Sequence, residues 1–195
     1  MTRNIGSRAI VPGSLAAVSK RENLTLAESF LSVDALILVD MSGSMGDRDA
    51  PGGRTRYEAA EQELRELQAA LPGKIGVVAF SSDVQFCPTG VPIRMGMGTD
   101  MAKALRFVRA ADGLAKIVLI SDGEPDSADA TLKEARLFKH RIDTVYIGPE
   151  SGPYARGREF LQRLAAATGG QSLQSAAPGL LKNETLKLLK AATVA

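Results

Sequence analysis

Four short apolar runs, separated by stretches of helical periodicity, limit most strongly the folds that this chain can adopt. The runs are rich in valine and isoleucine and show little alternation of apolar and polar residues; they cover residues 35–39, 75–80, 117–120 and 142–147. Strands that are buried on both faces have this composition, and they are typical of a parallel sheet covered by helices. The sequence therefore predicts an α/β fold with a mostly parallel central sheet.

The stretches between these runs have the spacing of amphipathic helices. Within residues 55–71, apolar side chains recur every three or four positions, while glutamates occupy the other faces. The same reasoning predicts helices over residues 100–110, 126–140 and 157–168, and a last one over about 178–192. Because such helices cross over between parallel strands, we expect helices on both faces of the sheet.

Two weaker patterns complete the predicted sheet. Residues 80–86 contain two short apolar segments around a polar turn, which predicts a hairpin and one antiparallel edge strand. Residues 171–175 predict a last edge strand. The expected architecture is Rossmann-like, with three layers and a sheet of about six strands.

The chain length predicts a single domain preceded by an extension. Its 195 residues, 45% of them hydrophobic, suffice for one substantial core. We assign residues 33–195, which carry the strand and helix patterns, to that domain. Residues 1–32 fit the pattern less well, apart from a short helix over 24–31, and we predict an N-terminal extension that is packed on the domain or partly disordered.

The composition argues against several classes of site. The single cysteine, Cys87, leaves no intramolecular disulfide and no cysteine-based zinc site. The only histidine, His140, lies at the end of a predicted helix, where we expect a cation at the helix C-terminus rather than a catalytic base. The net charge of +2, from scattered basic residues, gives no field for nucleic acid.

The hydropathy pattern predicts no membrane contact. No apolar run approaches the roughly 20 residues that span a bilayer. The N-terminal stretch is a poor signal peptide because Pro12 and Gly13 interrupt it. We therefore expect a cytoplasmic protein.

Oxygen-bearing side chains follow the predicted parallel strands, at the points where the strands end. Asp40, Ser42 and Ser44 come directly after the first strand, Asp122 follows the third, and Thr99 precedes the next predicted helix. The carboxyl ends of parallel strands meet at one edge of a sheet, so we expect these five side chains to lie close together. Hard oxygen ligands without nitrogen or sulfur favour Mg²⁺, with Mn²⁺ or Ca²⁺ as alternatives.

The order and spacing of these motifs resemble a known metal site. D-M-S-G-S at 40–44, G-T-D at 98–100 and S-D-G at 121–123 look like the metal-ion-dependent adhesion site of von Willebrand factor type A (vWA) domains, above all of bacterial members. The resemblance covers about residues 33–192 and implies the vWA fold. It implies metal contacts through the hydroxyl groups of Ser42, Ser44 and Thr99, and through Asp40 and Asp122 directly or by way of water.

The same resemblance implies a function in binding. Sites of this kind leave one coordination position open for a Glu or Asp side chain of a partner protein. Similar bacterial proteins often work beside AAA+ ATPases or in multi-protein assemblies in the cytoplasm, which are therefore the expected partners. A surface adhesin is the alternative within the binding class.

An enzymatic alternative uses the same first aspartate. An aspartyl-phosphate phosphatase would also place an aspartate after an apolar strand beside Mg²⁺, with Asp40 as the nucleophile. Such enzymes have a second acid two residues later, where this chain has Ser42, and a lysine near the phosphate. Because neither partner is evident, we predict that the protein is not an enzyme.

Several neighbouring residues have ordinary structural explanations. A turn could account for Asp40, and Asp122 with Gly123 is a common turn pair. Asp100 is expected to cap a helix. The other acidic residues nearby are expected to be solvated loop charges: Asp47, Asp49, Glu124 and Asp126.

The methionines gather in the same segments. Of the six in the chain, only Met1 lies elsewhere. We expect Met41, Met45 and Met101 to point inward and anchor the loops. Met95 and Met97 are predicted to form an exposed apolar rim that would adapt to a partner surface.

Overall fold

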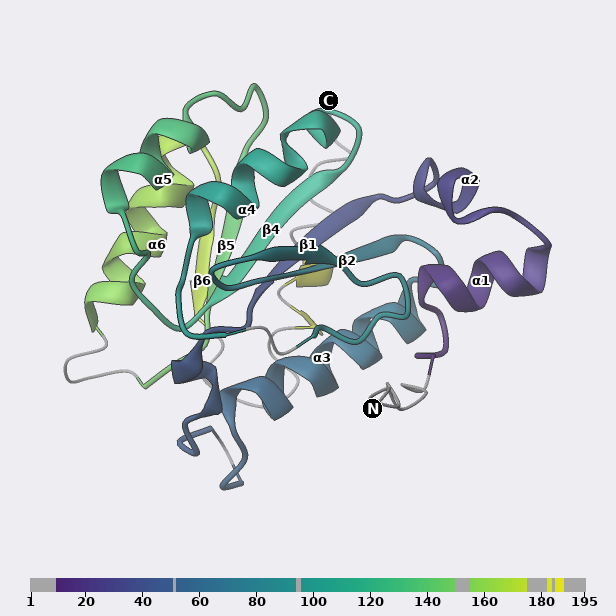
Figure 1. Cartoon of the computed structure of the whole chain (residues 1–195), viewed down its shortest axis with the longest axis horizontal. Coiled ribbons are helices and arrows are strands. Elements are labelled where there is room, and N and C mark those ends of the chain that lie inside the picture. Colours follow the sequence, from purple (N-terminus) through teal and green to yellow (C-terminus); the bar gives the residue numbers. More distant parts are fainter. Residues whose placement is uncertain are drawn as a thin grey trace, which may run out of the picture.

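Six strands form one sheet in the order β3-β2-β1-β4-β5-β6 (Figure 1). The computed structural model describes residues 10–50, 52–93, 96–149, 155–174, 182–183 and 185–187. The strands are β1 (Ala35–Asp40), β2 (Ile75–Phe80), β3 (Val84–Phe86), β4 (Lys116–Ser121), β5 (Ile142–Tyr146) and β6 (Ser172–Gln174). All neighbouring pairs are parallel except β2 and β3. The predicted α/β architecture, with one antiparallel edge strand, is confirmed.

The register of the central strands brings their carboxyl ends to one level. Asp40, the last residue of β1, lies opposite Phe80, the last residue of β2. On the other side of β1, Val39 lies opposite Ile120, so β4 also ends beside Asp40. The loops that follow these strands therefore begin at the same edge of the sheet.

The helices form two layers that bury opposite faces of the sheet (Figure 1). One face packs against α3 (Arg56–Ala70), and its core contains Ile37 and Val39 of β1 with Leu64 and Leu67 of α3. The other face packs against three helices, namely α4 (Met101–Val108), α5 (Ala128–Ala135) and α6 (Ala155–Ala167). Successive β1 residues point to opposite faces, which explains why the whole strand is apolar and buried.

The helix starts follow capping rules. Thr55 caps α3 in a capping box, accepting from the backbone N–H of Glu58 while the Glu58 side chain accepts from the N–H of Thr55. Asp100 caps α4 as predicted, accepting from Lys103 at 2.9 Å. Ser127 caps α5, accepting from the backbone N–H of Ala130.

The prediction that the helix over 126–140 reaches His140 is wrong, because α5 ends at Ala135. Beyond this point Phe138 turns into the core. The Asp112 carboxylate then accepts from the backbone N–H groups of Lys139 and His140 at 2.7 and 3.1 Å. This carboxylate takes up two N–H groups that a longer helix would have bonded internally, so His140 is not a helix C-terminal residue.

The region before residue 33 contains two helices, of which only the second was predicted. They are α1 (Leu15–Glu22) and α2 (Leu26–Phe30), and α2 falls inside the predicted helix over 24–31. Leu15 is 1% exposed and belongs to the core. Gly13 has a φ of +83°, and a Cβ there would lie 2.2 Å from the carbonyl oxygen of Gln68 in α3. Residues 11–19 thus pack closely on the rest of the fold, residues 20–28 are exposed, and the domain boundary at residue 32 stays a prediction.

The predicted last helix is described only in part. Residues 182–183 and 185–187 are helical, and the backbone N–H of Lys182 donates to Glu63 of α3 at 3.0 Å. The rest of the predicted range, 178–192, lies outside the described residues. Within the described part of the chain, no helix has both the length and the apolarity needed to cross a lipid bilayer.

Candidate metal centre

Asp40 forms the centre of a hydrogen-bonded cluster at the carboxyl edge of the sheet. Its side chain is fully buried, and each carboxylate oxygen has a donor. Oδ1 accepts from the backbone N–H of Ser42 at 2.8 Å, and Oδ2 accepts from the hydroxyl of Ser121 at 2.6 Å. The Ser121 hydroxyl itself accepts from the N–H of Gly123 at 3.1 Å. These bonds fix the orientation of the carboxylate and join the end of β1 to the end of β4.

Ser42 and Ser44 turn their hydroxyl groups toward the loop after β4. The two oxygen atoms lie 3.2 Å apart, and Ser44 donates to Oδ1 of Asp122 at 3.0 Å. Ser42 precedes a short 3-10 helix, η1 (Gly43–Gly46), but its side chain does not cap it. The serine hydroxyls are therefore not used for an ordinary turn, and hydrogen bonds link four of the five predicted site residues.

Thr99, the fifth predicted residue, is tied to the same loop through its backbone. Its N–H donates to Oδ1 of Asp126 at 2.9 Å, and its carbonyl accepts from the N–H of Asp126 at 3.0 Å. Asp100 adds a bond to the carbonyl of Ser81, just after β2, at 2.9 Å. Thr99 is 9% exposed, and its hydroxyl makes no hydrogen bond to any other described residue. Asp126 is exposed, as predicted for a loop charge, and its carboxylate in addition holds the Thr99 loop.

Arg56 is the residue of the site that sequence reasoning missed. This first residue of α3 is 1% exposed, and its Nη1 donates to Oδ2 of Asp122. On its other side, Nε donates to Asp49 at 2.8 Å, and Nη2 lies 3.6 Å from a carboxylate oxygen of Asp47. The same guanidinium reaches the backbone carbonyl of Ser44 at 3.4 Å. Asp49 is therefore an ion-pair partner of Arg56 and not a free loop charge.

One signal in the sequence could have identified Arg56. A cation at the first position of a helix is disfavoured by the helix dipole, which places positive charge at that end. An arginine directly after the capping threonine, and shortly after two aspartates, therefore needs a local reason. Here the reason is the buried carboxylate of Asp122, which is 66 positions away along the chain.

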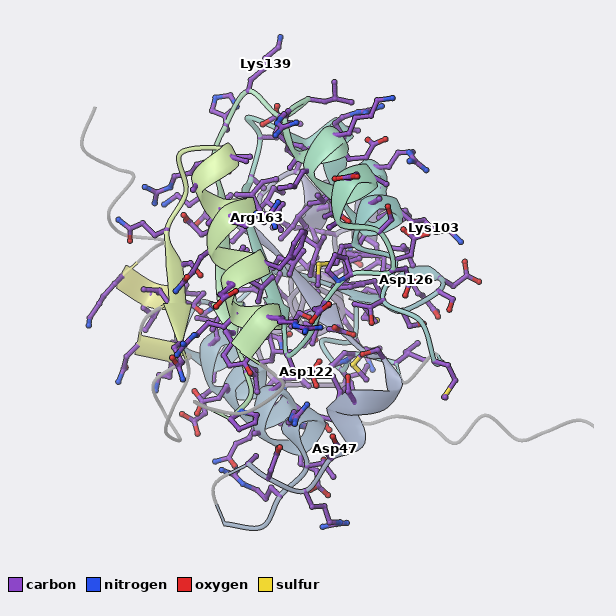
Figure 2. All side chains as sticks on the ribbon, turned by 90° about the vertical axis from the view of Figure 1, so that its left-hand side faces the viewer. Asp47, Lys103, Asp122, Asp126, Lys139 and Arg163 are labelled. Carbon is purple, nitrogen blue, oxygen red and sulfur yellow. The ribbon has the colours of Figure 1, made fainter. Side chains whose placement is uncertain are left out.

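The two site carboxylates share a dry environment and repel one another. Burial raises the pKa of Asp40 to about 6, and the negative charge of Asp122 adds to the effect. Burial also raises the pKa of Asp122, against the hydrogen bond and the positive charge of Arg56, which lower it. Figure 2 shows Asp122 at the same end of the molecule as Asp47, while Lys139 lies at the opposite end. An added positive charge at the site would therefore stabilise the ionised form of both carboxyl groups.

The donor set fits a hard divalent cation. It consists of the carboxylates of Asp40 and Asp122 and three hydroxyl groups, without nitrogen or sulfur. Among the residues that the structure describes, no three His, Cys, Asp or Glu side chains form a group that could hold a metal ion. A metal ion at this edge would therefore depend on the hydroxyl groups of Ser42, Ser44 and Thr99.

The methionines near the site divide into buried and exposed members. Met41 and Met45 are each 1% exposed and Met101 is fully buried, as predicted, so they anchor the loops. Met97 is 89% exposed, and its sulfur lies 3.4 Å from the position that a Cβ on Gly43 would take, beside the two site serines. Met95 lies outside the described residues. The predicted rim is thus described for Met97 alone.

Comparison with known proteins identifies the fold. No protein-family model matches the sequence, and no curated protein sequence matches it. Solved structures do match. An aerotolerance-related membrane protein from Bacteroides fragilis is 16% identical, with a TM-score of 0.60, over 82% of this chain and 99% of that chain. A von Willebrand factor type A protein from Catenulispora acidiphila is 18% identical, with a TM-score of 0.59, over 81% of this chain and 42% of that chain.

A third similar structure contains a metal ion. The manganese-loaded TRAP protein of Plasmodium vivax is 18% identical, with a TM-score of 0.55, over 82% of this chain and 72% of that chain. At such low identities the likeness concerns the fold alone. The chain therefore has the three-layer fold of vWA domains, with its oxygen-rich loops at the carboxyl edge of the sheet.

Proposed function

We propose that this chain is a vWA-type binding module whose adhesion site holds a divalent cation and, through it, an acidic residue of a partner protein. The preferred ion is Mg²⁺, with Mn²⁺ and Ca²⁺ as alternatives. The observation that carries the proposal is the hydrogen bond from Ser44 to Asp122, because it joins two oxygen-bearing loops that are 78 residues apart in the chain. A hydrogen bond within an ordinary turn would join residues that are close in sequence, whereas this bond joins the loop after β1 to the loop after β4.

The residues of the chain have distinct roles in this proposal. Ser42, Ser44 and Thr99 would offer hydroxyl oxygens to the ion, and Asp40 and Asp122 would offer carboxylate oxygens directly or through water. Ser121 holds the carboxylate of Asp40 in one orientation, so that little reorganisation is needed when a ligand arrives. A bound divalent cation supplies a Lewis acid whose remaining position accepts a carboxylate oxygen.

The geometry favours binding over catalysis. A phosphatase with Asp40 as the nucleophile would have a second acid two residues later, but this position is Ser42, whose hydroxyl lies 3.2 Å from that of Ser44. Lys103, the lysine closest to Thr99 in the sequence, already donates to Asp83 at 2.6 Å. His140, the only histidine, pairs with Asp112. We therefore propose a non-enzymatic role, with the Asp40 phosphatase as the second candidate.

The partner and the compartment follow from the resemblance to bacterial vWA proteins. We propose a partner that presents a Glu or Asp, in a cytoplasmic assembly that includes an AAA+ ATPase. Nucleic acid and membrane are not proposed as partners. One of the structurally similar proteins is described as a membrane protein, so the compartment needs its own test, by fractionation of cells that express the full chain.

Thermal unfolding with and without metal tests the proposal. Mg²⁺ or Mn²⁺ at about 100 times its dissociation constant should stabilise the protein by about 2.7 kcal/mol relative to EDTA, which is roughly 5–10 °C for a chain of this size. Ser44→Ala and Thr99→Ala should reduce this gain. Ser32→Ala, a control before the opposite end of β1 whose hydroxyl donates to the carbonyl of Ser29, should keep it.

Two results would contradict the proposal. If metal ions do not stabilise the unmodified protein, the proposal of a metal site is refuted. Metal-dependent release of phosphate from p-nitrophenyl phosphate, lost in Asp40→Asn, would favour the phosphatase instead.

A further inference from the structure

We propose that Arg56 is the internal counter-cation of the metal centre, which lowers the affinity for the metal ion but keeps the loaded centre positive enough to attract a partner carboxylate. The inference rests on the proposed function, since it describes how the same site is tuned. It concerns a residue that is not a ligand. An arginine cannot coordinate a cation, so its burial among the site residues needs an explanation of its own.

The contacts of Arg56 place its charge inside the site. The side chain is 1% exposed, and one edge of the guanidinium donates to Asp122 while the other donates to Asp49. Its Nη1 also reaches the backbone carbonyl of Ser44, which carries a site hydroxyl on its side chain. Because a guanidinium stays charged at any pH that proteins tolerate, this positive charge is permanent.

The buried charges leave a positive group once a divalent cation is bound. Asp40 and Asp122 supply two buried carboxylates, and the buried guanidinium of Arg56 supplies one positive charge, so the buried group carries a net charge of minus one. A divalent cation would bring this charge to plus one. Asp47 and Asp49, whose side chains are 49% and 36% exposed, are largely compensated by water.

The inner part of the cluster shows what Arg56 does for binding. Without Arg56, a divalent cation between Asp40 and Asp122 would be fully neutralised and would have little attraction for another carboxylate. With Arg56 beside Asp122, the same group keeps one positive charge. The guanidinium therefore competes with the metal ion for Asp122, and it preserves the charge on which capture of an acidic side chain depends.

The position of Arg56 also connects the site to a surface loop. Its side chain bonds to Asp49, and its backbone N–H donates to the carbonyl of Asp47 at 3.1 Å. A change in the bond between Arg56 and Asp122 on metal binding would therefore reach the loop that precedes α3. This loop lies at the same end of the molecule as Asp122 (Figure 2).

Metal titration of charge variants tests the inference. We expect Arg56→Gln to bind Mn²⁺ at least about tenfold more tightly than the unmodified protein, because the substitution removes a full positive charge from a buried, poorly screened site. The electron paramagnetic resonance signal of the free ion measures the binding. Arg56→Lys keeps the positive charge, so its affinity for Mn²⁺ should lie closer to that of the unmodified protein than to that of Arg56→Gln. Arg65→Gln is the matched control, since Arg65 lies on the same helix and pairs with Glu61 at the surface.

Loss of the buried pair could unfold Arg56→Gln, and two measurements cover this outcome. The double variant Arg56→Gln, Asp49→Asn also removes the exposed carboxylate that pairs with the other edge of the guanidinium, and it should bind Mn²⁺ more tightly as well. If either variant is unfolded in EDTA, Mn²⁺ should restore its circular dichroism spectrum, because the ion supplies the missing positive charge. Failure of Mn²⁺ to restore folding would overturn the inference.

The remaining outcomes separate the two proposals. If the unmodified protein binds no Mn²⁺, both the proposed metal site and the role of Arg56 are refuted. If the unmodified protein binds Mn²⁺ and a folded Arg56→Gln binds it equally or more weakly, only the role of Arg56 is refuted. In that case Arg56 acts as a structural ion-pair partner that positions Asp122.

Discussion

Replacement of Asp40 by asparagine should make the metal-free protein more stable. The side chain of Asp40 is fully buried, and its pKa of about 6 lies above the value of 3.8 for an exposed aspartate. The folded protein therefore holds the charged form less well than the unfolded chain does. At neutral pH this difference amounts to about 3 kcal/mol of lost stability.

Asparagine removes the charge but keeps most of the hydrogen bonds. Its side-chain oxygen can accept from the N–H of Ser42, and its amide can donate to the hydroxyl of Ser121, which has a second lone pair. The weaker bonds should cost about 1 kcal/mol. The expected net gain is about 2 kcal/mol, or roughly 4–8 °C in melting temperature.

The pH dependence of this gain is the sharpest check. A raised carboxyl pKa leaves the stability of the folded state unaffected below about pH 3.8 and lowers it progressively as the pH rises through about 6. Urea unfolding in EDTA should therefore show little advantage for Asp40→Asn near pH 4 and the full advantage at about pH 7.5. Asp34→Asn is the control, because this carboxylate lies just before β1 and its side chain is 59% exposed.

The reasoning is refuted if Asp40→Asn is less stable than the unmodified protein at neutral pH without metal. It is also refuted if the stability difference is the same at both pH values, because the gain would then have another origin. Addition of Mg²⁺ should reverse the order of stability, since the variant lacks a metal carboxylate. Such a reversal would identify Asp40 as a residue that serves binding at the expense of stability.

Three further predictions concern the surroundings of the site. Leu15→Ala should lower the free energy of unfolding by about 2–4 kcal/mol in a urea titration, because Leu15 is buried in the core; a cost below about 1 kcal/mol would show that α1 is not part of the cooperative unit. Asp126→Ala should reduce the metal-dependent rise in melting temperature, because the N–H of Thr99 loses its acceptor and the Thr99 loop loosens; an unchanged rise would exclude this role. Thr55→Ala should destabilise the protein by about 1 kcal/mol in thermal unfolding, because α3 loses its cap. Metal affinity should stay unchanged, and a change in it would indicate that the neighbouring Arg56 had also moved.

The general plan of the site could be predicted from residue types and their order. Asp40, Ser42 and Ser44 follow a strand whose residues are all apolar, and Asp122 follows another such strand. Parallel strands must end at one edge, so the convergence of these side chains was a consequence of topology. The hydrogen bond between Ser44 and Asp122 agrees with that expectation.

The roles of the surrounding charges could not be predicted in this way. Asp126, which we interpreted as a solvated charge, accepts a hydrogen bond from the backbone of Thr99, and Arg56 bonds to Asp122 from the start of α3. The local sequence around a charged loop residue is the same whether its side chain is solvated or pairs with a buried group. The choice depends on which group lies opposite it after folding.

The sequence by itself determined the layers of the fold and the edge of the sheet at which the oxygen-bearing side chains gather. A strand that is buried on both faces leaves an unbroken apolar run, and an amphipathic helix leaves an apolar period of 3.6 residues. Both patterns can be read from neighbouring residues in the sequence. The tertiary structure alone decided where α5 ends, how residues 10–32 pack and what neutralises Asp122. The physical reason is that these features arise from single contacts across long separations, such as the 27 residues between Asp112 and Lys139 and the 66 between Arg56 and Asp122, which leave no periodic trace.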